Sequence, residues 1–185
     1  MFTGTLLEYS KSALPPACRT PKMSGYHTTS GGLKHMAVRI GYASGVYDLF
    51  HIGHLNLLRH ARSRCDYLIA GVASPEMSER LKGTTPVVPL AERLEIVRSI
   101  RYVDDVVVDE HVNKADTWAE VGFNVFFKGD DWRGTEKGER LERDMARINV
   151  EVVYLPYTAT TSSTMLRRAL TALEGRRAGN AVLNA

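Results

Sequence analysis

Short apolar runs alternate along the chain with longer stretches in which apolar residues recur every three or four positions. The short runs are rich in β-branched and aromatic side chains, which is typical of strands buried on both faces of a parallel sheet. They predict five strands, at residues 38–43, 67–73, 105–108, 125–128 and 151–155.

The longer stretches have the period of amphipathic helices. In one of them, Leu90, Leu94 and Val97 share an apolar face, and Arg93 falls on the opposite, polar face. Strands and helices that alternate in this way form βαβ units, so we expect an α/β fold with a doubly wound, Rossmann-like parallel sheet of five strands. The predicted helices are residues 53–63, 90–100, 114–121, 137–148 and 163–173.

Both ends of the chain lack this periodicity. Residues 1–36 are rich in Ser, Thr, Gly and Pro, and we expect a disordered tail or a segment upstream of a true start at Met36. Residues 175–185 are expected to form a flexible C-terminal tail. The predicted domain therefore spans residues 37–174, and a chain of 185 residues has room for one such domain.

Composition excludes several classes of protein. Apolar residues make up 44% of the chain, but no apolar run approaches the roughly 18 residues of a membrane span. Residues 1–36 hold the whole net charge of +3, so residues 37–185 are balanced and we do not expect nucleic-acid binding. Cys18 and Cys65 have no CxxC spacing, which favours a cytoplasmic protein without a disulfide scaffold or zinc site.

The strongest chemical signal is the segment 45–54, which follows the first predicted strand and enters the first predicted helix. Its sequence is GVYDLFHIGH. His51 and His54 lie beside the positive end of the helix dipole, where exposed N–H groups bind anions, and Gly53 lets a phosphate approach the backbone. Ligands of doubly wound sheets bind beyond the carboxyl ends of the strands, so this junction predicts a phosphate site.

A second candidate phosphate site follows the fifth predicted strand. Residues 160–164 read TTSST, five hydroxyl side chains in succession at the start of a predicted helix. One side-chain oxygen is enough to cap a helix, so five favour a site in which hydroxyls and N–H groups bind an anion.

These segments resemble motifs of one family. GVYDLFHIGH resembles the HxGH signature of the cytidylyltransferase-like nucleotidyltransferases, which implies the HIGH type of Rossmann-like fold. Residues 101–106, RYVDDV, are similar to that family's RYVD motif, which lies near the active site and the usual dimer interface. Residues 128–132, KGDDW, look like the GDDW segment of glycerol-3-phosphate cytidylyltransferases, the members that the chain resembles most. Residues 158–164 occupy the place of the family's RTxGISTT loop.

The resemblance implies an activity and a set of site residues. We expect CMP transfer from CTP to a phosphorylated small alcohol such as glycerol 3-phosphate, with Mg²⁺ accompanying the triphosphate, in a homodimer. His51, His54 and Lys82 are expected to be catalytic, and Lys114 to bind the acceptor. The expected nucleotide-binding residues are Val46, Tyr47, Asp48, Gly53, Asp131, Thr158, Thr161, Ser162, Ser163 and Thr164.

Other features keep the substrate open. Tyr157 stands where the family's loop has arginine and Thr160 where it has glycine, so a bidentate partner for polyphosphate is lost. Lys128 is similar to a lysine of adenylyltransferase members that act on heptose phosphates. The alternatives are therefore an adenylyltransferase acting on a sugar phosphate or cofactor precursor, and a noncatalytic nucleotide-binding module. Asp48 and Asp131 are equally compatible with structural hydrogen bonding.

Overall fold

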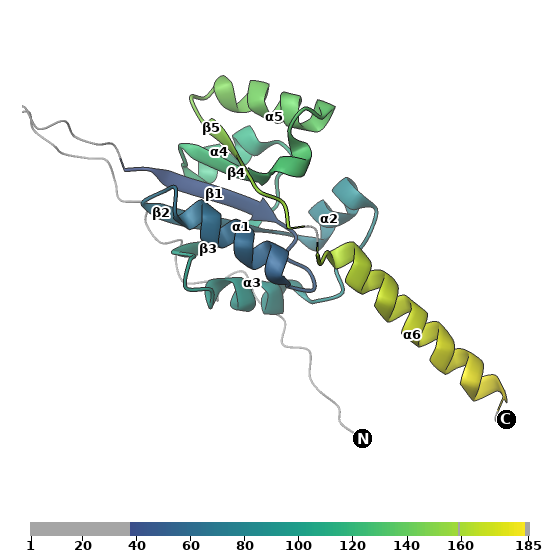
Figure 1. Ribbon diagram of the computed structural model, residues 1–185. Coiled ribbons are helices and arrows are strands. Elements are labelled where there is room, and N and C mark those ends of the chain that lie inside the picture. The colour runs from purple at the N-terminus through teal and green to yellow at the C-terminus, as the bar shows by residue number, and fades with distance from the viewer. Residues whose placement is uncertain (1–37, 159, 184–185) are drawn as a thin grey trace, which may run out of the picture. The chain divides into compact units, whose positions relative to one another are not determined.

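A parallel sheet of five strands forms the centre of residues 38–158 and 160–183, the part of the chain that the computed structural model describes (Figure 1). The strands are β1 (Ile40–Gly45), β2 (Tyr67–Ala73), β3 (Asp105–Asp109), β4 (Val125–Gly129) and β5 (Glu151–Leu155). Their order across the sheet is β3-β2-β1-β4-β5. The chain therefore changes direction of winding at β1, and the switch point lies between β1 and β4. The predicted fold class is confirmed.

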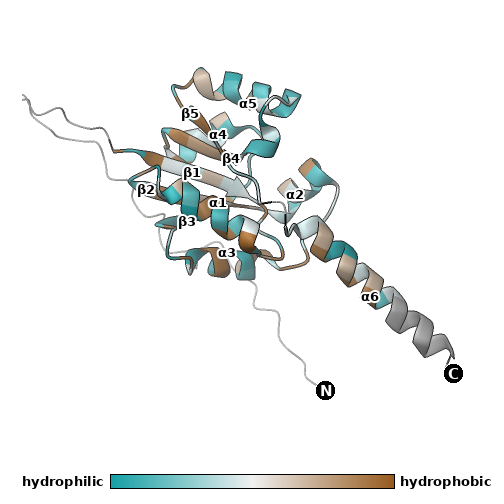
Figure 2. Ribbon diagram, in the orientation of Figure 1, coloured by the Kyte–Doolittle hydropathy of each residue, from teal (hydrophilic) through white to brown (hydrophobic). Residues whose placement is uncertain are grey.

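Helices connect and follow the strands of this sheet. They are α1 (Ile52–Arg62), α2 (Pro75–Lys82), α3 (Leu90–Arg98), α4 (Lys114–Val121), α5 (Glu136–Ala146) and α6 (Ser163–Leu183), and a short 3₁₀ helix, η2 (Asp130–Trp132), follows β4. On one face Leu58 of α1 and Val97 of α3 pack with Phe127. On the other, Met145 of α5 packs with Phe126. Figure 2 shows apolar residues along the strands and hydrophilic ones on α5.

The sequence pattern does not predict helix α2. It predicts a loop at residues 80–83 instead. The ends of α2 are defined by local chemistry: the Ser74 hydroxyl accepts a hydrogen bond of 3.1 Å from the Met77 N–H, and Gly83 ends the helix with a left-handed φ of 64°. The helix escapes detection because only Met77 and Ser78 are buried, too few to produce a period. Lys82 therefore lies in the last turn of a helix.

The last helix is longer than its pattern predicts. The prediction ends it at residue 173 and begins a flexible tail at residue 175, but α6 continues to Leu183. Gly175 is the reason for the error, although one glycine within a helix costs only about 1 kcal/mol relative to alanine. The predicted tail at residues 1–36 lies outside the described residues. No helix of the described part of the chain is long and apolar enough to cross a membrane.

Candidate active site

The turn between β1 and α1 is strained. Tyr47 and Leu49 have positive φ angles of 53° and 48°, a conformation that side-chain-bearing residues adopt rarely and that clusters at functional sites. The Tyr47 hydroxyl donates to the Ala43 carbonyl over 2.9 Å, and its ring is buried. The Tyr47 side chain thus anchors the turn in the core. The predicted contact of Tyr47 with nucleotide would therefore be made by its backbone.

The two histidines lie side by side where α1 begins, with ring centroids 4.0 Å apart. His51 caps the helix, because its Nδ1 accepts a hydrogen bond of 3.0 Å from the Gly53 N–H. A neutral His51 therefore carries its proton on Nε2, where it can donate to a ligand. A Cβ on Gly53 would come within 2.8 Å of the His51 ring and 3.6 Å of the Thr161 carbonyl. Glycine is needed at this close approach.

The surroundings of both imidazoles favour their neutral forms. Burial lowers the pKa of His51. Burial, followed by the nearby His51 and Lys82, lowers the pKa of His54 to about 3. The Nδ1 atom of His54 is buried without a hydrogen-bond partner among the described residues. Such an atom is costly to leave unpaired, which favours a site that a ligand or water completes.

Asp48 holds two other segments in place, the loop at Val87 and Val88 and the start of α6. Its carboxylate accepts hydrogen bonds of 3.0 and 2.9 Å from the N–H groups of Val87 and Val88. Arg167 of α6 donates to the same carboxylate over 2.6 Å, and the Ser163 hydroxyl donates to the Asp48 carbonyl over 2.8 Å. Because Asp48 is only 2% exposed, its side chain serves the architecture of the site. A contact with nucleotide would have to come from its backbone.

Arg93 is a buried cation that the sequence pattern misplaces on the polar face of α3. It is 1% exposed. Nε donates to the Val88 carbonyl over 2.9 Å, and Nη1 donates to the carbonyls of Val46 and Ala73 over 2.7 and 2.8 Å. Arg93 therefore ties together the segments that follow β1 and β2, and it occupies the carbonyl of Val46, a predicted nucleotide-binding residue.

The loop between β5 and α6 meets the start of α1. The Thr158 hydroxyl accepts a 3.0 Å hydrogen bond from Asn56 of α1, and the Ser162 hydroxyl caps the first turn of α6. No hydrogen bond joins the hydroxyls of Thr161 and Thr164 to any other residue that the structure describes. The N-termini of α1 and α6 thus lie together, and their N–H groups and dipoles favour an anion at this point.

Lys82, at the end of α2, lies within electrostatic reach of His54. Its ammonium group contributes to the low pKa of His54. Its own pKa is lowered by burial and by Arg167, with Asp48 and Asp131 acting in the opposite direction. Asp131, in η2, is exposed. The structure therefore brings the predicted residues Lys82, His54 and Asp131 into one electrostatic neighbourhood.

Lys114, the predicted acceptor-binding residue, is paired with a buried carboxylate at the end of β3. Its Nζ lies 2.8 and 2.7 Å from the two oxygens of Asp109, and its side chain is 12% exposed. Ser44 of β1 also donates to Asp109 over 2.5 Å, and Thr117 donates over 3.3 Å. Lys114 is therefore held in one position by groups from β1, β3 and α4. Asp109 is not among the predicted site residues, because it is simply the polar residue at the end of an apolar strand in the sequence.

Lys128, at the end of β4, stacks on Trp132. Its Nζ lies 4.1 Å from the centroid of the indole ring. Burial lowers the pKa of Lys128 to about 8, and the charges of Lys114 and Lys82 contribute to this shift. The three lysines therefore lie within electrostatic reach of one another and make this edge of the sheet suitable for phosphate groups.

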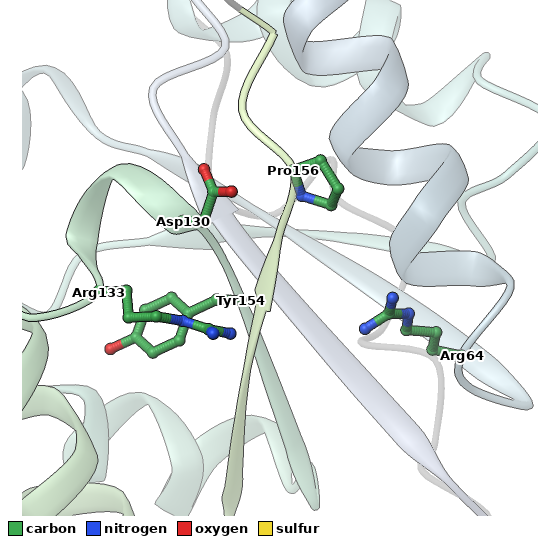
Figure 3. A pocket seen from close by; sticks show the side chains of 5 residues that line it. All are labelled: Arg64, Asp130, Arg133, Tyr154 and Pro156. Carbon is green, nitrogen blue, oxygen red and sulfur yellow. The ribbon is translucent and has the colours of Figure 1, made fainter.

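A separate hollow of about 510 Å³ follows the edge strand β5 (Figure 3). Figure 3 shows Arg64 on one side of the strand and Arg133 with Tyr154 on the other. Asp130 and Pro156 complete its lining. None of the predicted catalytic or nucleotide-binding residues lines this hollow, so we place the chemistry at the paired histidines.

A parallel sheet whose first turn sets two histidines at a helix N-terminus, among lysines, defines a nucleotidyltransferase of the HxGH type. More narrowly, the chain belongs to the cytidylyltransferase-like family, because the family model described as "Cytidylyltransferase-like" matches residues 42–169. That range contains every residue predicted for the site, and the family resemblance read from the motifs is confirmed.

The curated proteins that are similar to this chain have several different names. It is 35% identical over 127 residues to the glycerol-3-phosphate cytidylyltransferase of Staphylococcus aureus, covering 68% of this chain and 90% of that protein. It is 36% identical over 132 residues to the bifunctional protein HldE of Acidiphilium cryptum, which is 70% of this chain but 27% of that longer protein. It is 42% identical over 79 residues to the FAD synthase of Pyrococcus abyssi, covering 43% and 51% of the two chains.

Solved structures agree on the fold. A lipopolysaccharide core biosynthesis protein from Thermoplasma volcanium superposes with a TM-score of 0.56 at 22% identity, covering 65% of this chain and 97% of that one. At this identity the likeness establishes the shared architecture, and the substrate has to be argued from the site.

Proposed function

We propose that the protein transfers CMP from CTP to a phosphorylated small alcohol, glycerol 3-phosphate or a close analogue, and releases pyrophosphate. The product is a CDP-alcohol. The observation that carries this proposal is the pair His51 and His54, with ring centroids 4.0 Å apart at the start of α1 and with the charge of Lys82 within reach of His54. The relative from Staphylococcus aureus, of which the chain covers 90%, supports this choice of nucleotide and acceptor.

The acceptor phosphate needs no base to activate it, because a phosphate monoester is largely ionised near pH 7. One of its oxygens attacks the α-phosphorus of CTP in line. The new bond joins that oxygen to the α-phosphorus, and the bond to the bridging oxygen of the β-phosphate breaks, so pyrophosphate leaves with the electron pair. Catalysis then depends on positioning and on stabilising charge.

The histidines supply that stabilisation as neutral donors. His51 presents Nε2–H because its Nδ1 is occupied by the Gly53 N–H, and His54 stays neutral because its pKa is about 3. Fixed donors in a partly dry site stabilise the charge that develops on the α-phosphate oxygens. The helix starts at α1 and α6, with Thr161, Thr164 and Lys82, would hold the rest of the triphosphate.

Mg²⁺ is proposed as a companion of the triphosphate. Among the described residues, no group of three or more His, Cys, Asp and Glu side chains could hold a metal ion. Mg²⁺ commonly binds one or two carboxylates together with substrate phosphates. The exposed Asp131, close to Lys82, is a carboxylate suited to that arrangement. The ion would add charge neutralisation for the leaving pyrophosphate.

Adenylyl transfer is the second candidate. The relatives named HldE and FAD synthase support it, as does Lys128. Tyr157 replaces the arginine of the family's loop and is 54% exposed; a phenol carries no positive charge, so it does not replace the lost one. The third candidate, nucleotide binding without turnover, is disfavoured by the intact pair of histidines.

Pyrophosphate release tests all three candidates. Purified protein with Mg²⁺ is given CTP or ATP with glycerol 3-phosphate, phosphocholine, phosphoethanolamine or a heptose 1-phosphate. Release with CTP and a phospho-alcohol is the expected result. Release with ATP alone would establish the adenylyl alternative, and tight CTP binding without release under any condition would favour the noncatalytic one.

A homodimer is proposed from the RYVD resemblance. In that segment Arg101 donates to the Tyr102 hydroxyl over 2.8 Å, and its guanidinium lies 5.0 Å from the Tyr102 ring centroid. Light scattering should give twice the chain mass of 20.6 kDa, and a mass near 20.6 kDa would exclude the dimer.

A further inference from the structure

One face of Trp132 is occupied by the protein's own cation. The Lys128 ammonium lies 4.1 Å from the ring centroid, well inside the range of about 6 Å over which a cation is attracted to an aromatic face. Faces of this kind are what proteins use to bind quaternary and primary ammonium ligands. A ligand cation could reach this face of Trp132 only by displacing Lys128.

The Lys128–Trp132 pair is connected to the predicted acceptor lysine through the sheet. Strand β4 pairs with β1 up to Ala43 and Phe127, so Ser44 and Lys128 come next on the two strands. Ser44 donates to Asp109, which holds Lys114. The effect of Lys114 on the pKa of Lys128 shows that their charges interact. An acceptor held by Lys114 therefore lies within reach of the charge on Lys128.

The charges near Lys128 are not balanced. Asp109 is bound to Lys114, and Asp48 is bound to Arg167. Asp131 interacts with both Lys82 and Lys128. The three ammonium groups of Lys82, Lys114 and Lys128 are thus set against two carboxylates, those of Asp109 and Asp131, which leaves an excess of positive charge. A second cation brought here by a substrate would be repelled, whereas neutral hydroxyls or an anion would not.

We propose that Lys128, by occupying the face of Trp132, determines acceptor specificity: it excludes acceptors with a cationic head and selects phosphorylated polyols or sugars. The inference rests on the proposed function in that the acceptor is a phosphate monoester. It is independent of whether the nucleotide is CTP or ATP. Phosphocholine and phosphoethanolamine are the excluded substrates, since each carries its positive charge within a few bonds of the phosphate.

Three variants test this role. Lys128→Met removes the charge and frees the ring, Lys128→Arg retains a cation over the ring, and Lys137→Met removes an exposed lysine of α5 as the matched control. For each, kcat/KM is measured with glycerol 3-phosphate and with phosphocholine. Wild type should prefer glycerol 3-phosphate by about 100-fold, within the range of several-fold to hundreds-fold that a like charge nearby costs in affinity.

Lys128→Met should lower this preference at least about tenfold, chiefly by improving KM for phosphocholine. Lys128→Arg and Lys137→Met should keep it. A structural role alone would reduce turnover of both acceptors equally and leave the ratio unchanged. Circular dichroism melting separates a specificity change from misfolding, because the ratio is read only on folded variants. If Lys128→Met does not fold, Lys128→Gln is the neutral variant whose ratio is compared with that of Lys128→Arg.

Two results would overturn the inference: wild type that uses phosphocholine as well as glycerol 3-phosphate, or an unchanged ratio in folded Lys128→Met. Calorimetric binding of the two acceptors, with a non-hydrolysable CTP or ATP analogue bound, gives the same comparison without turnover. If no acceptor supports pyrophosphate release, the proposed function fails, and the binding preference alone then decides whether Lys128 discriminates between the acceptors.

Discussion

Arg167 of the last helix donates a hydrogen bond of 2.6 Å to the carboxylate of Asp48 in the first turn of the sheet, although the two residues are 119 positions apart. The Asp48 side chain is 3% exposed and that of Arg167 is 32% exposed. Arg167 also donates to the Thr85 carbonyl over 2.8 Å. The pair therefore fixes the start of α6, and the loop that joins it to β5, against the turn that carries His51 and His54.

Replacing Arg167 by methionine should weaken nucleotide binding and the fold together. The change leaves the buried Asp48 carboxylate without its charged partner, which should lower the free energy of unfolding by about 1–3 kcal/mol after allowance for the partial exposure of the arginine. KM for the nucleotide should rise about tenfold. Urea unfolding and steady-state kinetics measure both effects. Arg168→Met, at the exposed neighbouring position, is the control, and equal behaviour of the two variants would contradict this role.

Replacing Arg93 by methionine should destabilise the domain. Three backbone carbonyls lose their donor in the interior, so the free energy of unfolding should fall by about 2–4 kcal/mol. Arg98→Met on the same helix removes only a surface ion pair with Glu95 and should change it by less than about 0.5 kcal/mol. Urea unfolding at pH 7 compares them. A stable Arg93→Met protein would show that these carbonyls find other donors.

Gly53→Ala should impair turnover while the fold stays intact. The new methyl group would lie within 2.8 Å of the His51 ring, so the imidazole has to move. A displacement of about 1 Å in a catalytic group can reduce turnover about 100-fold. Alanine is otherwise the better helix former, by about 1 kcal/mol. Thermal unfolding and kcat are measured together, and wild-type kcat would show that His51 is not positioned by this contact.

His54→Asn should lower kcat by about 100- to 1,000-fold, because it alters one fixed donor to the developing charge. His111→Asn, which removes a partly exposed histidine paired with Glu120, is the control and should retain wild-type kcat. The comparison uses saturating nucleotide, so that weaker binding does not imitate a loss of turnover. Unchanged kcat in His54→Asn would remove His54 from the catalytic group.

The low pKa of His54 makes stability depend on pH. In the folded protein this pKa is about 3, against an ordinary value of 6.5. Between these values the unfolded chain binds a proton at this position and the folded chain does not. The stabilising contribution is therefore present above pH 6.5 and is lost as the pH falls toward 3, by at most about 1.4 kcal/mol per pH unit.

The difference between wild type and His54→Asn isolates this contribution. Their free energies of unfolding should converge or cross as the pH is lowered from 7 to 4, because only the wild type loses the histidine's contribution. Urea unfolding at several pH values measures it. A difference that is constant with pH would mean that His54 has an ordinary pKa in the folded protein.

The sheet was predictable because its strands are buried on both faces and read as unbroken apolar runs. β2 and β5 begin and end at the predicted residues. The paired histidines were predictable because a short motif and its strand-to-helix context lie in one continuous segment. Local chemistry sufficed for both, since neither depends on contacts with distant parts of the chain.

Arg93 and Asp109 could not be found in this way. Periodicity assigns a charged residue to the solvent face, and the carbonyls that make burial favourable for Arg93 come from residues up to 47 positions away. Asp109 looks like the polar end of an apolar strand until Ser44, 65 positions away, is placed beside it. Likewise, the hydrogen bond between Arg167 and the Asp48 carboxylate can be predicted only once the position of α6 is known.

The contact between Asp48 and Arg167 also has a consequence for synthesis of the protein. Chains emerge from the ribosome N-terminus first and fold as they emerge, so the histidine turn is made early and must wait for α6. A nascent chain that already contains all five strands still has only half of its anion site. Under the proposed function nucleotide contacts the starts of both α1 and α6, so by mass action it should stabilise the finished domain over incomplete forms. The proposed affinity for nucleotide would thus depend on whether α6 has already been synthesised.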